Sequence, residues 1–192
     1  MTTADGRSRS AADDRSVLLL TGVMAAGKST VAQRLAELRV RSVHVRGDVF
    51  RRFVVGGRVE PEPEMSEEAW AQLRLRYRLA VTTADAYAEA GFAVVLQDVI
   101  LGPVLAEVVA MIKTRPRYVV VLDPDPAVIA ARAAHRSKGG YSASSWDARQ
   151  LVTGLRETTP AIGLWLNTAG QTPLDTAHEI LGRLDEALVD AH

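Results

Sequence analysis

The chain contains no cysteine, and its 23 basic side chains are matched by 23 acidic ones. The absence of cysteine excludes a disulfide framework and thiolate chemistry, and it fits a reducing, cytoplasmic environment. The formal net charge of zero lacks the basic excess that is typical of proteins whose main partner is nucleic acid. From these absences we expect no nucleic-acid partner.

A long hydrophobic segment suited to a membrane is also absent. Residues 1–15 are small and polar without the apolar centre of a signal peptide, which predicts a disordered tail. The most apolar stretch, residues 93–112, is interrupted by Gln97, Asp98 and Pro103, and an aspartate at the centre of a bilayer costs about 2.5–3.5 kcal/mol. We interpret this stretch as a strand, a loop and a helix, and we expect no membrane partner.

What the sequence does contain is a regular alternation of strand and helix patterns. Five short apolar runs have the composition of parallel strands buried on both faces, at residues 16–21, 42–46, 92–97, 118–122 and 162–167. Helical patterns separate the runs. This order predicts a single α/β domain over residues 16–192, a three-layer sandwich around a five-stranded parallel sheet, as in P-loop NTP hydrolases and nucleoside kinases.

The longest predicted helix begins after Ser66, which can act as its N-cap. Its apolar residues recur at helical spacing and define a stripe made of Trp70, Leu73, Tyr77, Ala80, Ala84, Tyr87 and Ala88. Two polar or glycine-rich segments, 54–66 and 135–147, are predicted to be surface loops. Loops of this length in a compact domain are often functional.

A complete phosphate-binding pattern follows the first predicted strand. The motif G-x-x-x-x-G-K-[ST], the Walker A motif or P-loop, spans residues 22–29 and runs into a helix. Backbone N–H groups and the helix N-terminus favour phosphate there, Lys28 is expected to reach the β- and γ-phosphates of ATP, and Ser29 to bind Mg²⁺. The predicted nucleotide-binding residues are Gly22, Ala25, Ala26, Gly27, Lys28, Ser29 and Thr30. A dinucleotide fold would also place an acid near Asp48, but it requires a different glycine spacing.

Absent motifs narrow the class of P-loop protein. The Asn-Lys-x-Asp motif with which GTPases read the base does not occur. Hydrolytic motors usually place a glutamate directly after the acid that ends the third strand, whereas Asp98 is followed by Val99. A hydrolytic motor would therefore need an acid from elsewhere in the sequence as its base. We favour a kinase, which needs a base near the acceptor hydroxyl, Mg²⁺, and cations around the transferred phosphoryl group.

Candidate residues for acceptor chemistry follow the second and third strands. Asp48 is expected at the carboxyl edge of the sheet as the base, although it can equally cap the helix that follows. Asp98 is a candidate for binding Mg²⁺ or the acceptor. Arg51 and Arg52 either clamp an anionic acceptor or form a solvated face. Tyr87 is a further candidate for lining the acceptor pocket, as is Trp70, although aromatic residues at helical spacing more often belong to the core.

A cationic helix end leads into the loop at 135–147. Arg132, Arg136 and Lys138 precede Gly139-Gly140, which suits a lid that closes over the phosphates and neutralises charge in the transition state. We therefore assign Arg132 to nucleotide binding and Arg136 to catalysis. The alternative is a basic helix end stabilised by its dipole.

With the phosphate loop, Asp48 and the sequence QDVILGP (97–103), residues 16–190 resemble small P-loop kinases, and in particular the chloramphenicol phosphotransferase-like family. The resemblance implies an ATP- and Mg²⁺-dependent O-phosphotransferase with an alcohol acceptor, and it makes an antibiotic-resistance enzyme one candidate. It implies Asp48 as the base, Lys28 and Ser29 at the phosphates, and Arg132 and Arg136 in the lid. The family often has paired acids where this chain has Gln97-Asp98.

Other functions share these features. A metabolite or nucleoside kinase of the same fold fits the motifs equally well. A polynucleotide-end kinase needs a basic channel, which the zero net charge disfavours. A nucleotide-binding regulatory protein has no use for a lid. The acceptor, the choice between ATP and GTP, and a possible homo-oligomeric state are left open by the sequence.

Overall fold

The computed structural model of the chain describes residues 15–60, 64–137 and 148–189. Its centre is a parallel five-stranded sheet with the order β2-β3-β1-β4-β5. The strands are β1 (Ser16–Gly22), β2 (Ser42–Arg46), β3 (Ala93–Gln97), β4 (Arg117–Leu122) and β5 (Leu164–Leu166). The predicted α/β fold is confirmed. The predicted tail and most of the predicted lid, residues 138–147, lie outside the described residues.

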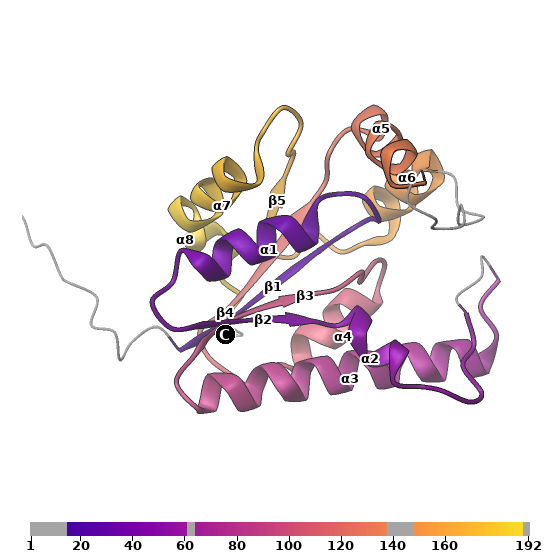
Figure 1. The fold of residues 1–192 in the computed structure, drawn as a ribbon, viewed down its shortest axis with the longest axis horizontal. Helices are drawn as coiled ribbons and strands as arrows, with labels where there is room; N and C mark the ends of the chain where they lie inside the picture. The colour runs from indigo at the N-terminus through magenta and orange to yellow at the C-terminus, as the bar shows by residue number, and fades with distance from the viewer. Residues whose placement is uncertain (1–14, 61–63, 138–147, 190–192) are drawn as a thin grey trace, which may run out of the picture.

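Helices cover both faces of the sheet (Figure 1). On one face lie α1 (Lys28–Glu37), α7 (Pro173–Gly182) and α8 (Leu184–Ala187), and on the other α3 (Glu67–Glu89) and α4 (Val104–Met111). The short α2 (Asp48–Arg52) follows β2 and packs on α3. Beyond the end of β4, the two remaining helices pack together: α5 (Pro126–Ser137) and α6 (Ala148–Thr158).

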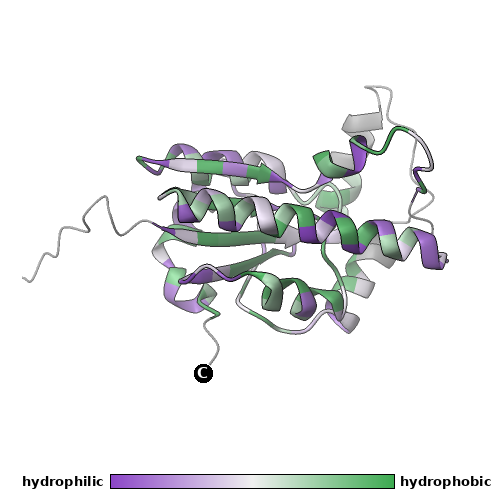
Figure 2. Ribbon diagram, turned by 90° about the horizontal axis from the view of Figure 1, so that it is seen from below, coloured by the Kyte–Doolittle hydropathy of each residue, from purple (hydrophilic) through white to green (hydrophobic). Residues whose placement is uncertain are grey.

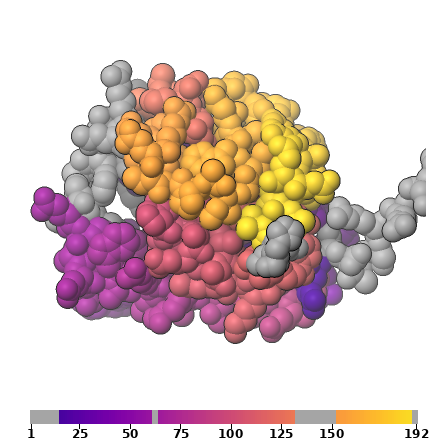
Figure 3. Space-filling view, turned by 180° about the vertical axis from the view of Figure 1, so that it is seen from behind, coloured from indigo at the N-terminus to yellow at the C-terminus, as the bar shows by residue number. Residues whose placement is uncertain are grey.

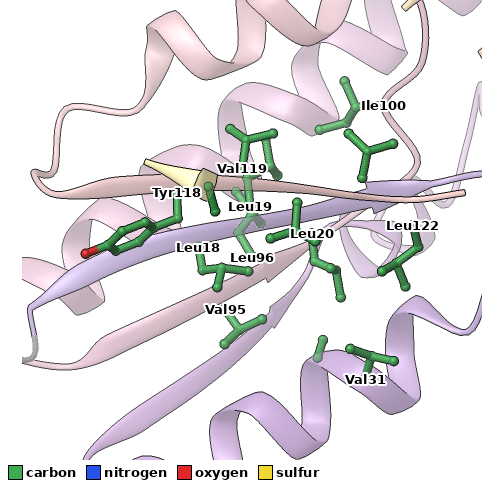
Figure 4. Packing of buried hydrophobic residues seen from close by; sticks show 14 of the residues in the cluster. Leu18, Leu19, Leu20, Val31, Val95, Leu96, Ile100, Tyr118, Val119 and Leu122 are labelled. Carbon is green, nitrogen blue, oxygen red and sulfur yellow. The ribbon is translucent and has the colours of Figure 1, made fainter. Parts of the chain in front are cut away.

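The core forms because β1 is buried along its whole length between β3 and β4. Its side chains alternate between the two faces and meet those of the neighbouring strands and α1, as shown for Leu19, Leu20, Leu96 and Val31 (Figure 4). The strands are largely hydrophobic and lie between helices of mixed hydropathy (Figure 2). This arrangement explains why the strands read as continuous apolar runs.

β5 is shorter than the apolar run 162–167 predicted. Gly163 has a φ of +69°, and a Cβ there would lie 2.2 Å from the carbonyl oxygen of Val119. The backbone therefore turns next to β4 before the strand begins. Only Leu164–Leu166 then follow the ladder of β4.

Local sequence signals correctly place the start of the longest helix. Ser66 Oγ accepts a hydrogen bond from the Ala69 N–H at 3.2 Å and caps α3. Two residues of the predicted stripe, Trp70 and Tyr87, are nevertheless 40% and 43% exposed. Trp70 lies in the first turn of α3, which extends past the sheet (Figure 1), and Tyr87 packs edge-on against Phe92 near the other end.

A buried hydrogen bond ties the end of α6 to the segment that leads into α4. Seen from behind, the chain around α6 lies directly over the segment that leads into α4 (Figure 3). There the Gly102 N–H donates to Thr159 Oγ1 at 2.7 Å. No helix among the described residues is long and apolar enough to cross a membrane.

Candidate active site

The carboxyl ends of β1, β2 and β3 bring three predicted features to one edge of the sheet. β1 ends at Gly22 and opens the phosphate loop, β2 is followed by Asp48, and β3 is followed by Asp98. Because the three strands are parallel neighbours in the order β2-β3-β1, their ends meet at this edge. The sequence pattern therefore folds into one candidate site.

The phosphate loop uses backbone conformations that favour glycine. Gly22 has a φ of +139°, and a Cβ there would lie 2.4 Å from the carbonyl oxygen of Leu122 on β4. Gly27, the N-cap of α1, has a φ of +96°. Ala25 also lies in the left-handed region, with a φ of +63°. The loop thus curls closely against β4 before it enters the helix.

Lys28 is buried and folded into the loop. Its Nζ donates to the carbonyl oxygens of Gly22 and Val23, at 2.9 and 2.7 Å. In the same turn Thr30 Oγ1 donates to the carbonyl oxygen of Gly27 at 2.8 Å, and Ser29 is half-buried. The ammonium group therefore sits beside the two residues that open the loop, where a phosphate chain would pass.

Asp48 is the first residue of α2 and lies between two arginines. Its Oδ2 is 3.4 Å from a terminal nitrogen of Arg46 and 3.6 Å from one of Arg52. Its Oδ1 is buried and has no hydrogen-bond partner among the described residues. A buried carboxylate oxygen without a partner is unusual and leaves Asp48 with an unused capacity to accept a hydrogen bond.

Asp98 is fully buried and paired with Arg76 of α3. Arg76 Nε donates to Asp98 Oδ2 at 3.0 Å, a second guanidinium nitrogen donates to Oδ1, and the Val99 N–H also donates to Oδ1. Arg76 was not among the site residues predicted from the sequence. Its spacing in the sequence could have revealed it: Arg76 lies three residues after Leu73 and four before Ala80, so a charged residue falls on the apolar stripe of the helix.

The surroundings of this pair shift the pKa values of Arg76 and of the neighbouring Tyr77. Burial alone would lower the pKa of Arg76, but the Asp98 carboxylate outweighs burial and raises that pKa, and the Asp48 carboxylate adds to the rise. Burial, together with Asp98, raises the pKa of Tyr77, whose hydroxyl donates to the carbonyl oxygen of Val99 at 2.8 Å. Arg76 therefore stays charged, and it lies within the electrostatic field of both acids.

Gly47 connects the two acids. Its N–H donates to the carbonyl oxygen of Gln97 at 2.9 Å, and a Cβ on it would lie 2.1 Å from Asp98 Oδ2. The Asp98 carboxylate therefore packs directly under the residue that precedes Asp48. We conclude that the Arg76–Asp98 pair supports the start of α2 and with it the position of Asp48.

A groove lies beside this edge, between α2, α3 and the segment 54–59. Arg51 lines it and forms an ion pair with Glu60, whereas Arg52 points its guanidinium towards Asp48. The residues that line this groove, which we name the acceptor groove after the role proposed below, are Phe50, Arg51, Val54, Val59, Ala69, Gln72, Leu73, Leu75, Arg76 and Leu79. Neither Trp70 nor Tyr87 is among them, so the structure does not bring the predicted aromatic residues to the groove.

The predicted lid residues can be placed only by their backbone. Arg132 and Arg136 lie on α5, and Lys138 is outside the described residues. A second arginine was not foreseen: Arg156 of α6 pairs with Asp123 through Nε, at 2.9 and 3.1 Å from the two carboxylate oxygens. Asp123 directly follows β4, so this pair fastens α6 to the sheet beside the phosphate loop.

The donor set fits Mg²⁺ held mainly by a nucleotide. Among the residues that the structure describes, no three His, Cys, Asp or Glu side chains gather as a metal site. Mg²⁺ in kinases typically needs only one or two protein oxygens besides the substrate phosphates and water. Ser29, in the first turn of α1, fits that role, whereas both oxygens of Asp98 already accept hydrogen bonds.

The fold and the phosphate loop together define a P-loop nucleotide-binding protein of the small-molecule kinase fold. The chain belongs to the AAA_33 family, described as an AAA domain, whose profile matches residues 17–161. A comparison with curated protein sequences found no match.

Solved structures share the fold over nearly the whole chain. A sugar kinase from Janibacter sp. HTCC2649 is similar with a TM-score of 0.65 at 21% identity, covering 90% of this chain and 95% of that one. The tunicamycin resistance protein of Deinococcus radiodurans is similar with a TM-score of 0.64 at 15% sequence identity, covering 92% of this chain and 99% of that one. A shikimate kinase from Acinetobacter baumannii, in complex with shikimate, is similar with a TM-score of 0.58 at 20% sequence identity, covering 86% of this chain and 90% of that one.

Proposed function

We propose that the protein is an ATP- and Mg²⁺-dependent O-phosphotransferase that phosphorylates a hydroxyl group of a small molecule. One observation carries the proposal: the complete phosphate loop and Asp48, with its unpartnered buried oxygen, lie at the same edge of a small-kinase fold. The acceptor groove begins on the helix that Asp48 opens. Donor and acceptor positions are thus adjacent.

In this mechanism the residues divide into donor and acceptor groups. Lys28 neutralises charge on the β- and γ-phosphates, and the loop N–H groups cradle them. Ser29 would hold the Mg²⁺ that comes with ATP, and that ion would supply further charge neutralisation. Asp48 accepts the proton of the acceptor hydroxyl while the oxygen of that hydroxyl attacks the γ-phosphorus and the bond between the γ-phosphorus and ADP breaks. Arg132 and Arg136 are assigned to the lid over the phosphates, and Asp98 to positioning Asp48 through Gly47.

An antibiotic is the finer assignment that we favour for the acceptor. The resemblance to chloramphenicol phosphotransferase-like proteins rests on the phosphate loop, Asp48 and residues 97–103. Similarity in fold to a tunicamycin resistance protein is consistent with it. A metabolite kinase is the second candidate, because a sugar kinase and a shikimate kinase share the same fold.

The test is a phosphotransfer screen with ATP, Mg²⁺ and a panel of antibiotics, nucleosides, sugars and oligonucleotides, with product mass detected. Asp48→Asn should lower kcat by about 10²–10⁴ while the Kd of a fluorescent ATP analogue stays within about threefold. Asp185→Asn, an exposed acid on α8, is the matched control and should transfer normally. Normal transfer by Asp48→Asn, or ATP hydrolysis that no acceptor stimulates, would contradict the proposal.

A further inference from the structure

The acceptor groove is lined mainly by apolar side chains. Seven of its ten lining residues are hydrophobic: Phe50, Val54, Val59, Ala69, Leu73, Leu75 and Leu79. Leu75 and Leu79 are 41% and 42% exposed, and Phe50 stacks edge-on with Phe53, which is 68% exposed. Exposed apolar side chains that gather at one groove indicate a candidate binding surface.

Each of the three polar residues that line the groove is already partnered within the protein. Arg76 is bound by Asp98, and Arg51 by Glu60. Gln72 donates to the carbonyl oxygen of Gly57 and to Glu68, and it accepts from the Val59 N–H at 3.1 Å. The side-chain amide of Gln72 is therefore used to hold the 57–59 segment against α3.

Charge around the groove is balanced as well. Glu60 is also 3.2 Å from Arg58, and Glu68 lies one turn before Gln72 on α3, so two arginines face two glutamates at the rim. A ligand carboxylate would have to compete with Glu60 or Asp98 for a guanidinium. Displacing Asp98 would in addition leave a buried carboxylate unpaired, which is strongly unfavourable.

We infer that the acceptor is an uncharged molecule whose apolar group fills this groove and whose hydroxyl reaches Asp48, rather than a hydroxy acid or a phosphorylated compound. This inference rests on the proposed function, because it identifies the groove as the acceptor side of the phosphotransferase. It also reassigns Arg51 from an anion clamp to a residue that fixes Glu60 and the groove wall. Affinity comes from buried apolar area, and the orientation of the hydroxyl comes from the Asp48 end.

Two probes of equal size separate the alternatives: 3-phenylpropane-1,2-diol, which is uncharged, and 3-phenyllactate, in which a carboxylate replaces the CH₂OH group. Binding to the full chain, with Mg²⁺ and a non-hydrolysable ATP analogue present, is measured by saturation-transfer NMR titration. We expect the diol to bind at least about tenfold more tightly than the acid. Transfer of phosphate to each probe from ATP is measured separately by mass.

Leu75→Asp places a charge at the groove and should weaken diol binding about tenfold. Leu38→Asp is the matched control, since Leu38 is 40% exposed against 41% for Leu75 but lies at the end of α1, on the opposite edge of the sheet. Both variants should bind the fluorescent ATP analogue like the parent.

Each outcome has a separate meaning. Equal or tighter binding of the acid, absence of diol binding, or a Leu75→Asp variant that binds the diol normally would overturn the inference. Diol binding that is lost in Leu75→Asp supports it. If that binding is present but no alcohol of the screen is ever phosphorylated, the proposed function fails while the assignment of the groove stands.

Discussion

Replacing Gly47 by alanine tests whether Asp98 supports the start of α2. The backbone of Gly47, with φ −63° and ψ −31°, suits alanine, so without other contacts the change would stabilise the protein by about 0.4–1 kcal/mol. The added Cβ, however, would lie 2.1, 2.6 and 3.0 Å from Oδ2, Cγ and Cβ of Asp98. Overpacking of this kind costs about 1–3 kcal/mol, so we expect Gly47→Ala to be destabilising.

The second arm of this experiment removes the carboxylate. Asp98→Ala alone should cost about 3–5 kcal/mol, because it leaves the guanidinium of Arg76, which is only 11% exposed, without its partner. In that background the two shortest contacts, to Oδ2 and Cγ, are gone and the contact with Cβ at 3.0 Å remains, so Gly47→Ala should cost less than it does in the parent protein. The double mutant should therefore be more stable than the sum of the single changes by about 1–3 kcal/mol.

Urea unfolding of the four proteins measures this coupling, and phosphotransfer assays measure its effect on catalysis. Gly56→Ala is the matched control, because a Cβ there meets no atom within 4 Å and its free energy of unfolding should change by less than about 0.5 kcal/mol. Strictly additive effects, or a Gly47→Ala protein as stable as Gly56→Ala, would refute the contact and the positioning role of Asp98.

Three further predictions concern other parts of the molecule. Lys28→Ala should weaken binding of a fluorescent ATP analogue at least about tenfold, because it removes the charged donor of the loop. Thr172→Ala should lower the free energy of unfolding by about 1 kcal/mol in a urea titration, since Thr172 and Asp175 form the capping box of α7. Burial lowers the pKa of His44 in the folded protein. Near and below about pH 6.5 the unfolded chain therefore binds more protons than the folded one, and the free energy of unfolding falls as the pH drops. In His44→Gln the loss of stability between about pH 7.5 and 5.5 should be smaller, and an unchanged loss would exclude His44 as its source.

The features that could be predicted from the sequence are those in which one contiguous segment specifies its own structure. β1 and the phosphate loop are adjacent in the chain, and the glycine spacing alone dictates the left-handed turns at Gly22 and Gly27. Parallel strands that are buried on both faces are also recognisable in the sequence, because nearly all of their residues are hydrophobic. The fold class and the position of the phosphate loop could therefore be predicted from the sequence.

The acceptor side depends on pairings between distant segments, which composition does not report. Arg76 is one of three alternate arginines on α3, at positions 74, 76 and 78, and only the crossing of α3 over the end of β3 selects it as the partner of Asp98. Likewise, nothing in the sequence indicates that Arg51 pairs with Glu60, which lies nine residues further along the chain. Tyr87 fitted the helical spacing but lies near the wrong end of a 23-residue helix.

The position of Lys28 makes nucleotide binding an exchange of partners rather than a simple gain. A polyphosphate that recruits this ammonium competes with the carbonyl oxygens of Gly22 and Val23, and an oxygen that loses its donor needs water or a changed loop in return. A ligand with a single phosphate that does not extend to Nζ leaves both internal bonds intact and gains little from the lysine. We therefore expect the loop to discriminate by the length of the phosphate chain as well as by its charge, and to favour a triphosphate over shorter anions.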